Sequence, residues 1–161
     1  MDAVRLIAAG RHALARSGAA LDIVGEAWQT QALAQGMGNW IAVSGPRELR
    51  SEARGLGEAG GRGCGVFDRA ALRCEGRGPD HPPRAAQLSG VADVRQALLG
   101  LQELLGEVGI ALVGVACATD DEGLYWQCIE SIDAADESSD RVRAILRLLM
   151  VRERGSTTGA A

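Results

Sequence analysis

A regular spacing of apolar residues between Val91 and Val115 constrains this chain more than any other feature. The gaps between them alternate between three and four residues without a break, at Val91, Val94, Leu98, Leu101, Leu105, Val108, Leu112 and Val115. This spacing is typical of a helix that packs lengthwise against other helices. Burying eight such side chains stabilises the fold by ~1.5–3 kcal/mol each, so we expect a helix here and an all-α fold around it.

Apolar spacing and helix-terminating residues predict three more helices. The predicted helices span about residues 3–17, 21–43, 90–118 and 121–152. Asp2 is a suitable N-cap for the first helix, and the second stops before Pro46, since proline cannot continue a helix. The last helix follows the capping box Thr119-Asp120-Asp121-Glu122. The sequence therefore predicts an antiparallel four-helix bundle.

Residues 44–88 differ from the rest because glycine and proline are frequent there. We expect a short helix to about Leu56, then a glycine-rich loop, and one or two further turns at 66–72. The prediction is one domain over 1–154, with 44–88 as an inserted connection and 155–161 as a disordered tail. Residues 55–60 match G-x-G-x-x-G, but without the preceding strand that a dinucleotide site needs.

Composition excludes several function classes. All 17 basic residues are arginine, so chemistry that needs a lysine is impossible. The net charge of −4 argues against nucleic-acid binding. The longest uncharged apolar run, Val108 to Ala118, has 11 residues, fewer than a membrane crossing needs, and no signal peptide is recognisable. We therefore expect a cytoplasmic protein that does not bind membranes.

Cysteine and histidine spacing favours neither a metal site nor an enzyme. The four cysteines are Cys64, Cys74, Cys117 and Cys128. Their C-x9-C and C-x10-C spacings do not match zinc sites, so we expect four reduced thiols and no metal or cofactor. G-x-S-x-G and H-E-x-x-H motifs are absent from the sequence, and no catalytic residue is predicted.

Four polar residues fall on or beside helix faces that are predicted to point inward: Arg11, Gln31, Gln35 and Asp136. Because buried charges must be paired, we expect Asp136 to pair with Arg11. One interpretation is a polar layer that fixes the helix register, or an Arg11 side chain that reaches outward. The other is a binding pocket for a small polar ligand. The sequence leaves both open.

The outer side of the 90–118 helix is also apolar, at Gly106, Ile110, Val113 and Cys117. A monomer would leave this surface exposed unless the 44–88 segment covered it. Exposed apolar patches of this kind mark interaction sites, and the commonest oligomer is a symmetric dimer. The sequence therefore predicts a homodimer interface here.

The last helix carries a stripe of carboxylates at Glu130, Asp133, Glu137 and Asp140. This stripe points away from the apolar face, so a solvated surface is expected rather than a metal site. Between Asp120 and Asp140 there are eight acidic residues and no basic residue. Such a surface can attract a basic protein partner.

Three blocks of sequence, Gly109–Asp120, Gly123–Glu130 and Ala27–Gln35, resemble an uncharacterised family of small helical proteins from high-GC actinobacteria. The resemblance extends over most of the chain. It implies no assigned activity and no catalytic residue.

The leading hypothesis for the function is a non-enzymatic cytosolic interaction or regulatory module that self-associates. The alternative is a ligand-binding or catalytic bundle that uses Arg11 and Asp136.

Overall fold

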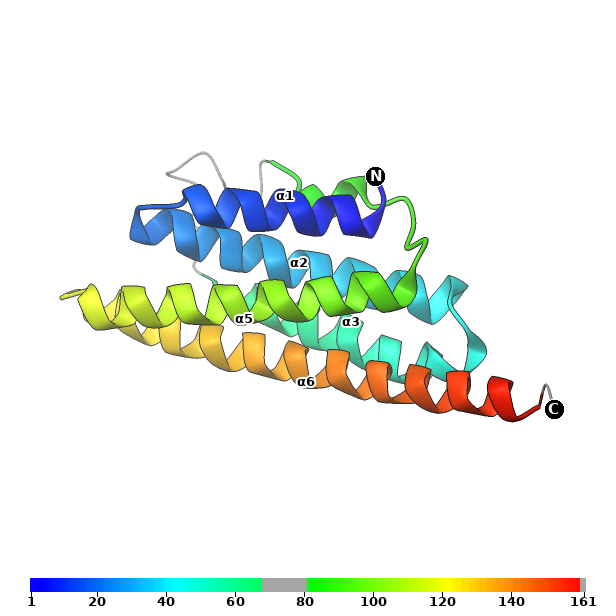
Figure 1. Cartoon of the computed structure of the whole chain (residues 1–161). Coiled ribbons are helices and arrows are strands. Elements are labelled where there is room, and N and C mark those ends of the chain that lie inside the picture. The colour runs from blue at the N-terminus through cyan, green and yellow to red at the C-terminus, as the bar shows by residue number, and fades with distance from the viewer. Residues whose placement is uncertain (68–80, 160–161) are drawn as a thin grey trace.

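The computed structural model describes residues 1–67 and 81–159, and helices run through most of both parts (Figure 1). The α-helices of these parts are α1 (Ala3–Arg16), α2 (Ala20–Ser44), α3 (Arg50–Gly65), α5 (Val94–Ala118) and α6 (Glu122–Thr158). Short 3₁₀ turns, η1 (Arg47–Leu49) and η2 (Arg84–Gln87), precede α3 and α5. No β-strand occurs within the described residues, so the predicted all-α class is confirmed.

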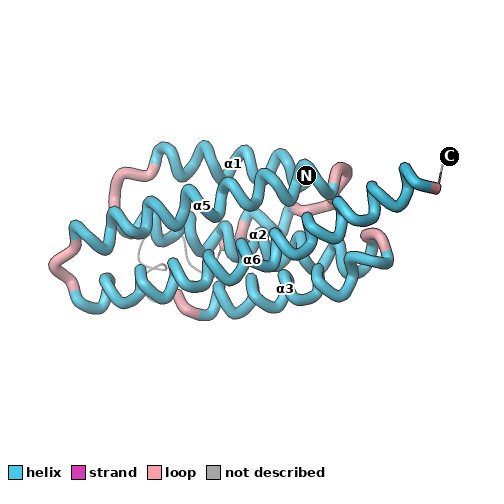
Figure 2. Tube along the Cα trace, turned by 60° about the horizontal axis from the view of Figure 1, so that its bottom comes forward, coloured by secondary structure: helices cyan, strands magenta, loops and turns pink. Residues whose placement is uncertain are grey.

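The helices lie lengthwise beside one another (Figures 1 and 2). Contacts link α2 to α3, α3 to α6, α6 to α5, and α5 back to α2, and each helix runs antiparallel to the next. Helix α1 lies against α2 and α5. The four predicted helices are all present, but α3 is a fifth long helix that occupies a place between α2 and α6.

The apolar residues that predict the 90–118 helix lie on the core side of α5, except Val91, which precedes the start of the helix at Val94. Seven of the eight are buried, and Val94 is half-buried and packs against the core. Leu98, Leu101 and Leu112 are completely inaccessible to solvent. The spacing argument is therefore confirmed for this helix, because its buried side chains follow the helical period that the sequence shows.

The predicted glycine-rich loop after Leu56 is wrong, because α3 continues as a helix to Gly65. A methyl group on Gly60 would lie 2.5 Å from the backbone nitrogen of Gln35, and one on Gly38 would overlap the backbone of Gly57. These glycines therefore let the backbones of α2 and α3 touch. The close contact offsets the ~1 kcal/mol that a glycine costs in a helix interior. Most of the turns predicted at 66–72 lie outside the described residues.

The ends of α6 differ from the prediction. Asp121, rather than Thr119, is its N-cap, and the Asp121 carboxylate accepts a hydrogen bond from the Leu124 N–H at 3.0 Å. Thr119 Oγ1 accepts one from the Asp121 N–H at 3.1 Å, which supports the turn before the helix. The helix then extends to Thr158, so the first residues of the predicted disordered tail are helical.

Hydrogen bonds at the chain start fix α1 beside the start of α5. Asp2 caps α1, as predicted, through a bond from the Val4 N–H, and its second carboxylate oxygen accepts from the Ala92 N–H. These backbone donors, led by Ala92, lower the pKa of Asp2. The Ala3 N–H also donates to the Gly90 carbonyl at 3.0 Å. The entry to α5 is thereby held against α1.

Candidate functional site

The predicted pair of Arg11 and Asp136 does not form. Arg11 lies on the exposed side of α1 and binds two carboxylates of α5, with Nη1 3.0 Å from Glu103 and Nε 3.2 Å from Glu107. The hydrogen bond to Glu107 is the main cause of a raised pKa for Arg11. Asp136 is exposed on α6. The prediction failed because helical phase places a residue on a face but does not show where a long arginine side chain ends.

The two predicted glutamines are also separated by the structure. Gln31 is buried, and its side-chain oxygen accepts a hydrogen bond from Ser138 of α6 at 2.8 Å. The Gln31 side chain lies over Gly63 of α3, where a methyl group would come within 2.5 Å of it. Gln35 is exposed. The polar contact in the interior is thus a neutral bond that joins α2 to α6, and sequence reasoning missed Ser138, since serine is common on both faces of helices.

The residues predicted as an interface form an exposed strip on α5. Gly106, Ile110, Val113 and Cys117 are all exposed, and Ile110 retains 76% of its accessible surface. Leu99, which lies about two helical turns before Gly106 on the same side of α5, is also exposed. We call these five residues the α5 strip. No segment within residues 1–67 or 81–159 covers it, so the apolar surface remains open to solvent.

Glycines within and beside the α5 strip face open space. A methyl group added to Gly106, Gly109 or Gly114 would meet no atom within 4 Å, apart from its own helix and chain neighbours. The described part of the chain therefore supplies no packing reason for these glycines, although each costs ~1 kcal/mol in a helix interior. Their environment is the opposite of that of the glycines between α2 and α3.

An apolar hollow of about 320 Å³ adjoins the strip, on the side of α5 that faces α2. It is lined by Gly18, Ala20, Ile23, Ala111, Gly114, Val115, Ala118 and Thr119. The α5 wall of this hollow is made mostly of small residues, and the exposed side chains of Ile110 and Val113 lie beside it. A ridge and a hollow therefore run next to each other along one helix.

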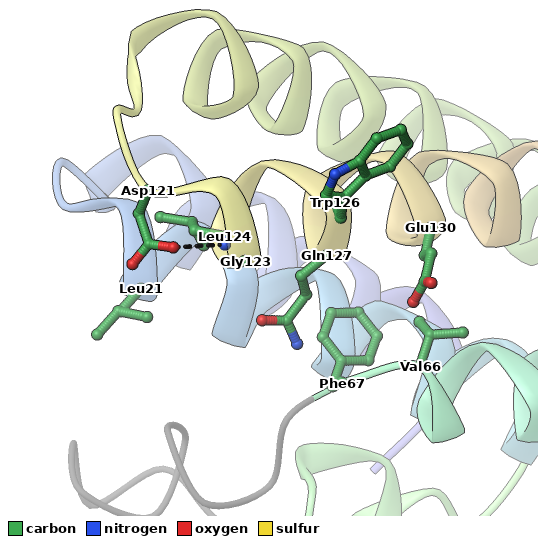
Figure 3. Close-up of a pocket in the computed structure, with 9 residues that line it drawn as sticks. All are labelled: Leu21, Val66, Phe67, Asp121, Gly123, Leu124, Trp126, Gln127 and Glu130. Atoms are coloured by element: carbon green, nitrogen blue, oxygen red, sulfur yellow. Dashed lines mark hydrogen bonds between the residues drawn. The ribbon is translucent and has the colours of Figure 1, made fainter.

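A larger hollow, of about 630 Å³, lies where α6 begins beside the end of α3 (Figure 3). The side chains of Gln127 and Glu130 point toward Phe67 and Val66, whereas the indole of Trp126 points away from them. Leu21 of α2 lines the hollow near Asp121. Sequence reasoning missed this site because its walls come from three helices that are far apart in the chain.

Comparison with models of protein families shows which family the chain belongs to. A family model described as a family of unknown function, DUF6099, matches residues 1–148. The chain is a DUF6099 protein. The match confirms the resemblance to an uncharacterised family, and it covers α1 to α5 and most of α6. No curated protein and no solved structure matches the chain, so no activity is transferred from a relative.

The DUF6099 chain has one helix, among those described, that meets the requirements of a membrane span. By length and composition α5 could cross a bilayer, although its uncharged run is short. This is weak evidence, because the core helix of a soluble protein meets the same requirements. Helix α5 also packs against three other helices through buried leucines.

The described cysteines of this DUF6099 protein lie in different surroundings. Cys117 is exposed on the α5 strip, Cys64 is half-buried on α3, and Cys128 is on the buried side of α6. Burial raises the pKa of the Cys128 thiol, which makes it less reactive. Cys74 lies outside the described residues. Within residues 1–67 and 81–159, no group of three or more His, Cys, Asp or Glu residues is placed to hold a metal ion.

Proposed function

We propose that this DUF6099 protein is a non-enzymatic interaction module that self-associates through the α5 strip. The carrying observation is that exposed Ile110 and Val113 stand beside glycines that meet nothing in the described chain. Apolar side chains flanking exposed backbone allow a second helix to approach closely. Contiguous apolar surface of this kind is rare on monomers unless it binds something.

A second copy of the chain is the partner that best fits the shape of this surface. In a two-fold dimer the same patch meets itself, so a protruding part must find a recess on that same patch. The ridge at Ile110 and Val113 lies directly beside the hollow formed by Ala111, Gly114 and Ala118. Two copies related by a two-fold axis can each place their ridge in the other's hollow.

The proposal also places the four long helices predicted from sequence in a bundle around a common core, with α3 as an added member. The support is the closed circuit of contacts through α2, α3, α6 and α5. In this arrangement α5 has one side in the core and one side free. The free side carries the α5 strip, so a partner can bind there without any rearrangement of the core.

We further propose a cytoplasmic location, because α5 also carries Glu103 and Glu107, which form solvent-accessible ion pairs with Arg11 of α1. These exposed charged groups would be costly next to lipid. Flotation of the purified protein with phosphatidylcholine and anionic lipid vesicles tests this. The protein should remain at the bottom of the gradient, and co-flotation would contradict the proposed location.

Size exclusion with light scattering tests self-association. The wild type should run as a dimer, and Val113→Arg should run as a folded monomer, because a charge at the contact cannot be desolvated without a partner. The matched control is Val43→Arg, since Val43 is a valine that is 75% exposed and belongs to another helix, α2. A wild type that is monomeric at its highest soluble concentration would rule the dimer out, and so would a Val113→Arg variant that remains dimeric.

A further inference from the structure

A groove runs along one side of α6, away from the α5 strip. The 630 Å³ hollow at the start of α6 and a second hollow of about 270 Å³ share Val66 and Glu130 as lining residues, so the two hollows adjoin each other. Together they extend from Asp121 to Glu137, which is ~24 Å at the rise of an α-helix. We call this combined feature the α6 groove. Its length exceeds that of a small molecule and suits a segment of polypeptide.

The floor of the α6 groove is apolar apart from Gln127, whose side chain points toward Phe67. It is formed by Leu21 of α2, by Val66 and Phe67 after α3, and by Leu124 and Ala134 of α6. Phe67 is only 5% exposed and so lies at the bottom rather than on the edge. A floor of this kind receives the apolar face of an amphipathic helix, whose anchor residues recur every three or four positions.

The rim of the α6 groove is negatively charged. Asp121, Glu130, Asp133 and Glu137 line it along the α6 side. Glu137 binds Arg62, which is the one cation among the described lining residues. Glu130 and Asp133 form no ion pair with any residue in 1–67 or 81–159. Two unpaired carboxylates beside an apolar floor favour a ligand that carries positive charge.

We propose that the α6 groove binds an amphipathic helix of a partner protein that carries arginine or lysine beside its apolar face. The apolar residues fill the floor over Phe67 and Val66, and the basic residues pair with Glu130 and Asp133. Nucleic acid is excluded by the sign of the rim charge. The proposal does not depend on the dimer, because the groove lies between α6 and α3 whereas the α5 strip is on another helix.

Selection from a displayed library of random 16-residue peptides, with the full chain as bait, tests this proposal. Enriched peptides should combine Arg or Lys with Leu or Ile at three- and four-residue spacing. Fluorescence anisotropy with a labelled selected peptide then measures Kd. Glu130→Arg should raise Kd by about tenfold or more, since reversing the charge makes an attraction repulsive.

Asp136→Arg is the matched control, because it changes net charge equally on the same helix without lining the groove. It should alter Kd by less than about threefold, since the charges of the solvated helix surface are screened. Equal weakening by both variants would overturn the proposal, as it would indicate general attraction to an acidic surface. Enrichment of acidic peptides, or of basic peptides without apolar residues, would overturn it as well.

Discussion

The helix pairs α2–α3 and α5–α6 are both antiparallel, yet they are held together in different ways. Between α2 and α3, glycines bring the two backbones into contact, at Gly38 with Gly57 and at Gly60 with Gln35. Between α5 and α6 the contact is made by side chains, since α5 buries leucine and valine and α6 buries residues that include Val142, Ile145 and Leu149. Helix α5 also contains glycines, but Gly106, Gly109 and Gly114 face outward. The same residue type thus closes one contact and leaves another surface open.

Replacing Gly60 by alanine should have the largest effect on this comparison. The new methyl group would lie 2.5 Å from the backbone of α2, which no side-chain rotation can relieve. We expect a loss of about 2–3 kcal/mol in the free energy of unfolding, at the upper end for an overpacked core. Urea titration measures it. Gly55→Ala is the control, since its methyl group meets only the flexible Arg141 side chain. Equal effects of the two substitutions would contradict a specific backbone contact.

The turn between α5 and α6 gives the next largest effect. Asp121→Ala removes the carboxylate that caps α6, and we expect a loss of about 1 kcal/mol in unfolding free energy. Thr119→Ala should cost less, because Thr119 supports the turn and not the helix end. Urea midpoints of the two variants decide between them. A larger loss for Thr119→Ala would mean that the helix begins earlier than Asp121.

Gly106→Ala should act in opposite directions on the monomer and on the dimer. The methyl group meets only open space, so the monomer should become more stable by about 0.5–1 kcal/mol through higher helix propensity. The dimer should become weaker, because the methyl group keeps a second helix further away. Urea titration of dilute protein and light scattering over a concentration series separate the two effects. A stabilised variant that dimerises like the wild type would show that Gly106 is not needed for close approach.

Thiol reactivity gives the smallest and most local test. In dilute native protein, brief iodoacetamide labelling should modify Cys117 and spare Cys128, since burial raises the pKa of Cys128 and only thiolates react. Raising the protein concentration should protect Cys117 as the dimer forms. Peptide mass spectrometry measures both sites. Labelling of Cys117 that does not depend on protein concentration would contradict the α5 strip as the dimer contact.

The cysteines are also expected to carry no disulfide, so four thiols should titrate after denaturation under non-reducing conditions.

Much of the fold was predictable from local pattern. The spacing from Val91 to Val115 identifies α5 and its buried side, because a helical period needs only neighbouring residues. Asp2 and Pro46 mark helix ends for equally local reasons. The stretch Leu56–Gly65 was not predictable in this way. Its glycines lower helix propensity. The helix α3 is stabilised there by close contact with the backbone of α2, which lies in another part of the chain.

The candidate sites divide in the same way. The outward position of Ile110 and Val113 follows from helical phase, so the sequence alone determined four of the five residues of the α5 strip, and the structure added Leu99. The partner of Arg11 was not determined by the sequence alone. A long side chain can reach several carboxylates, and only packing placed α5 beside α1. Likewise, Phe67 and Leu21 meet Glu130 only after three helices have come together. Local periodicity determines what each helix presents, and tertiary packing decides which of those surfaces are filled and which remain open.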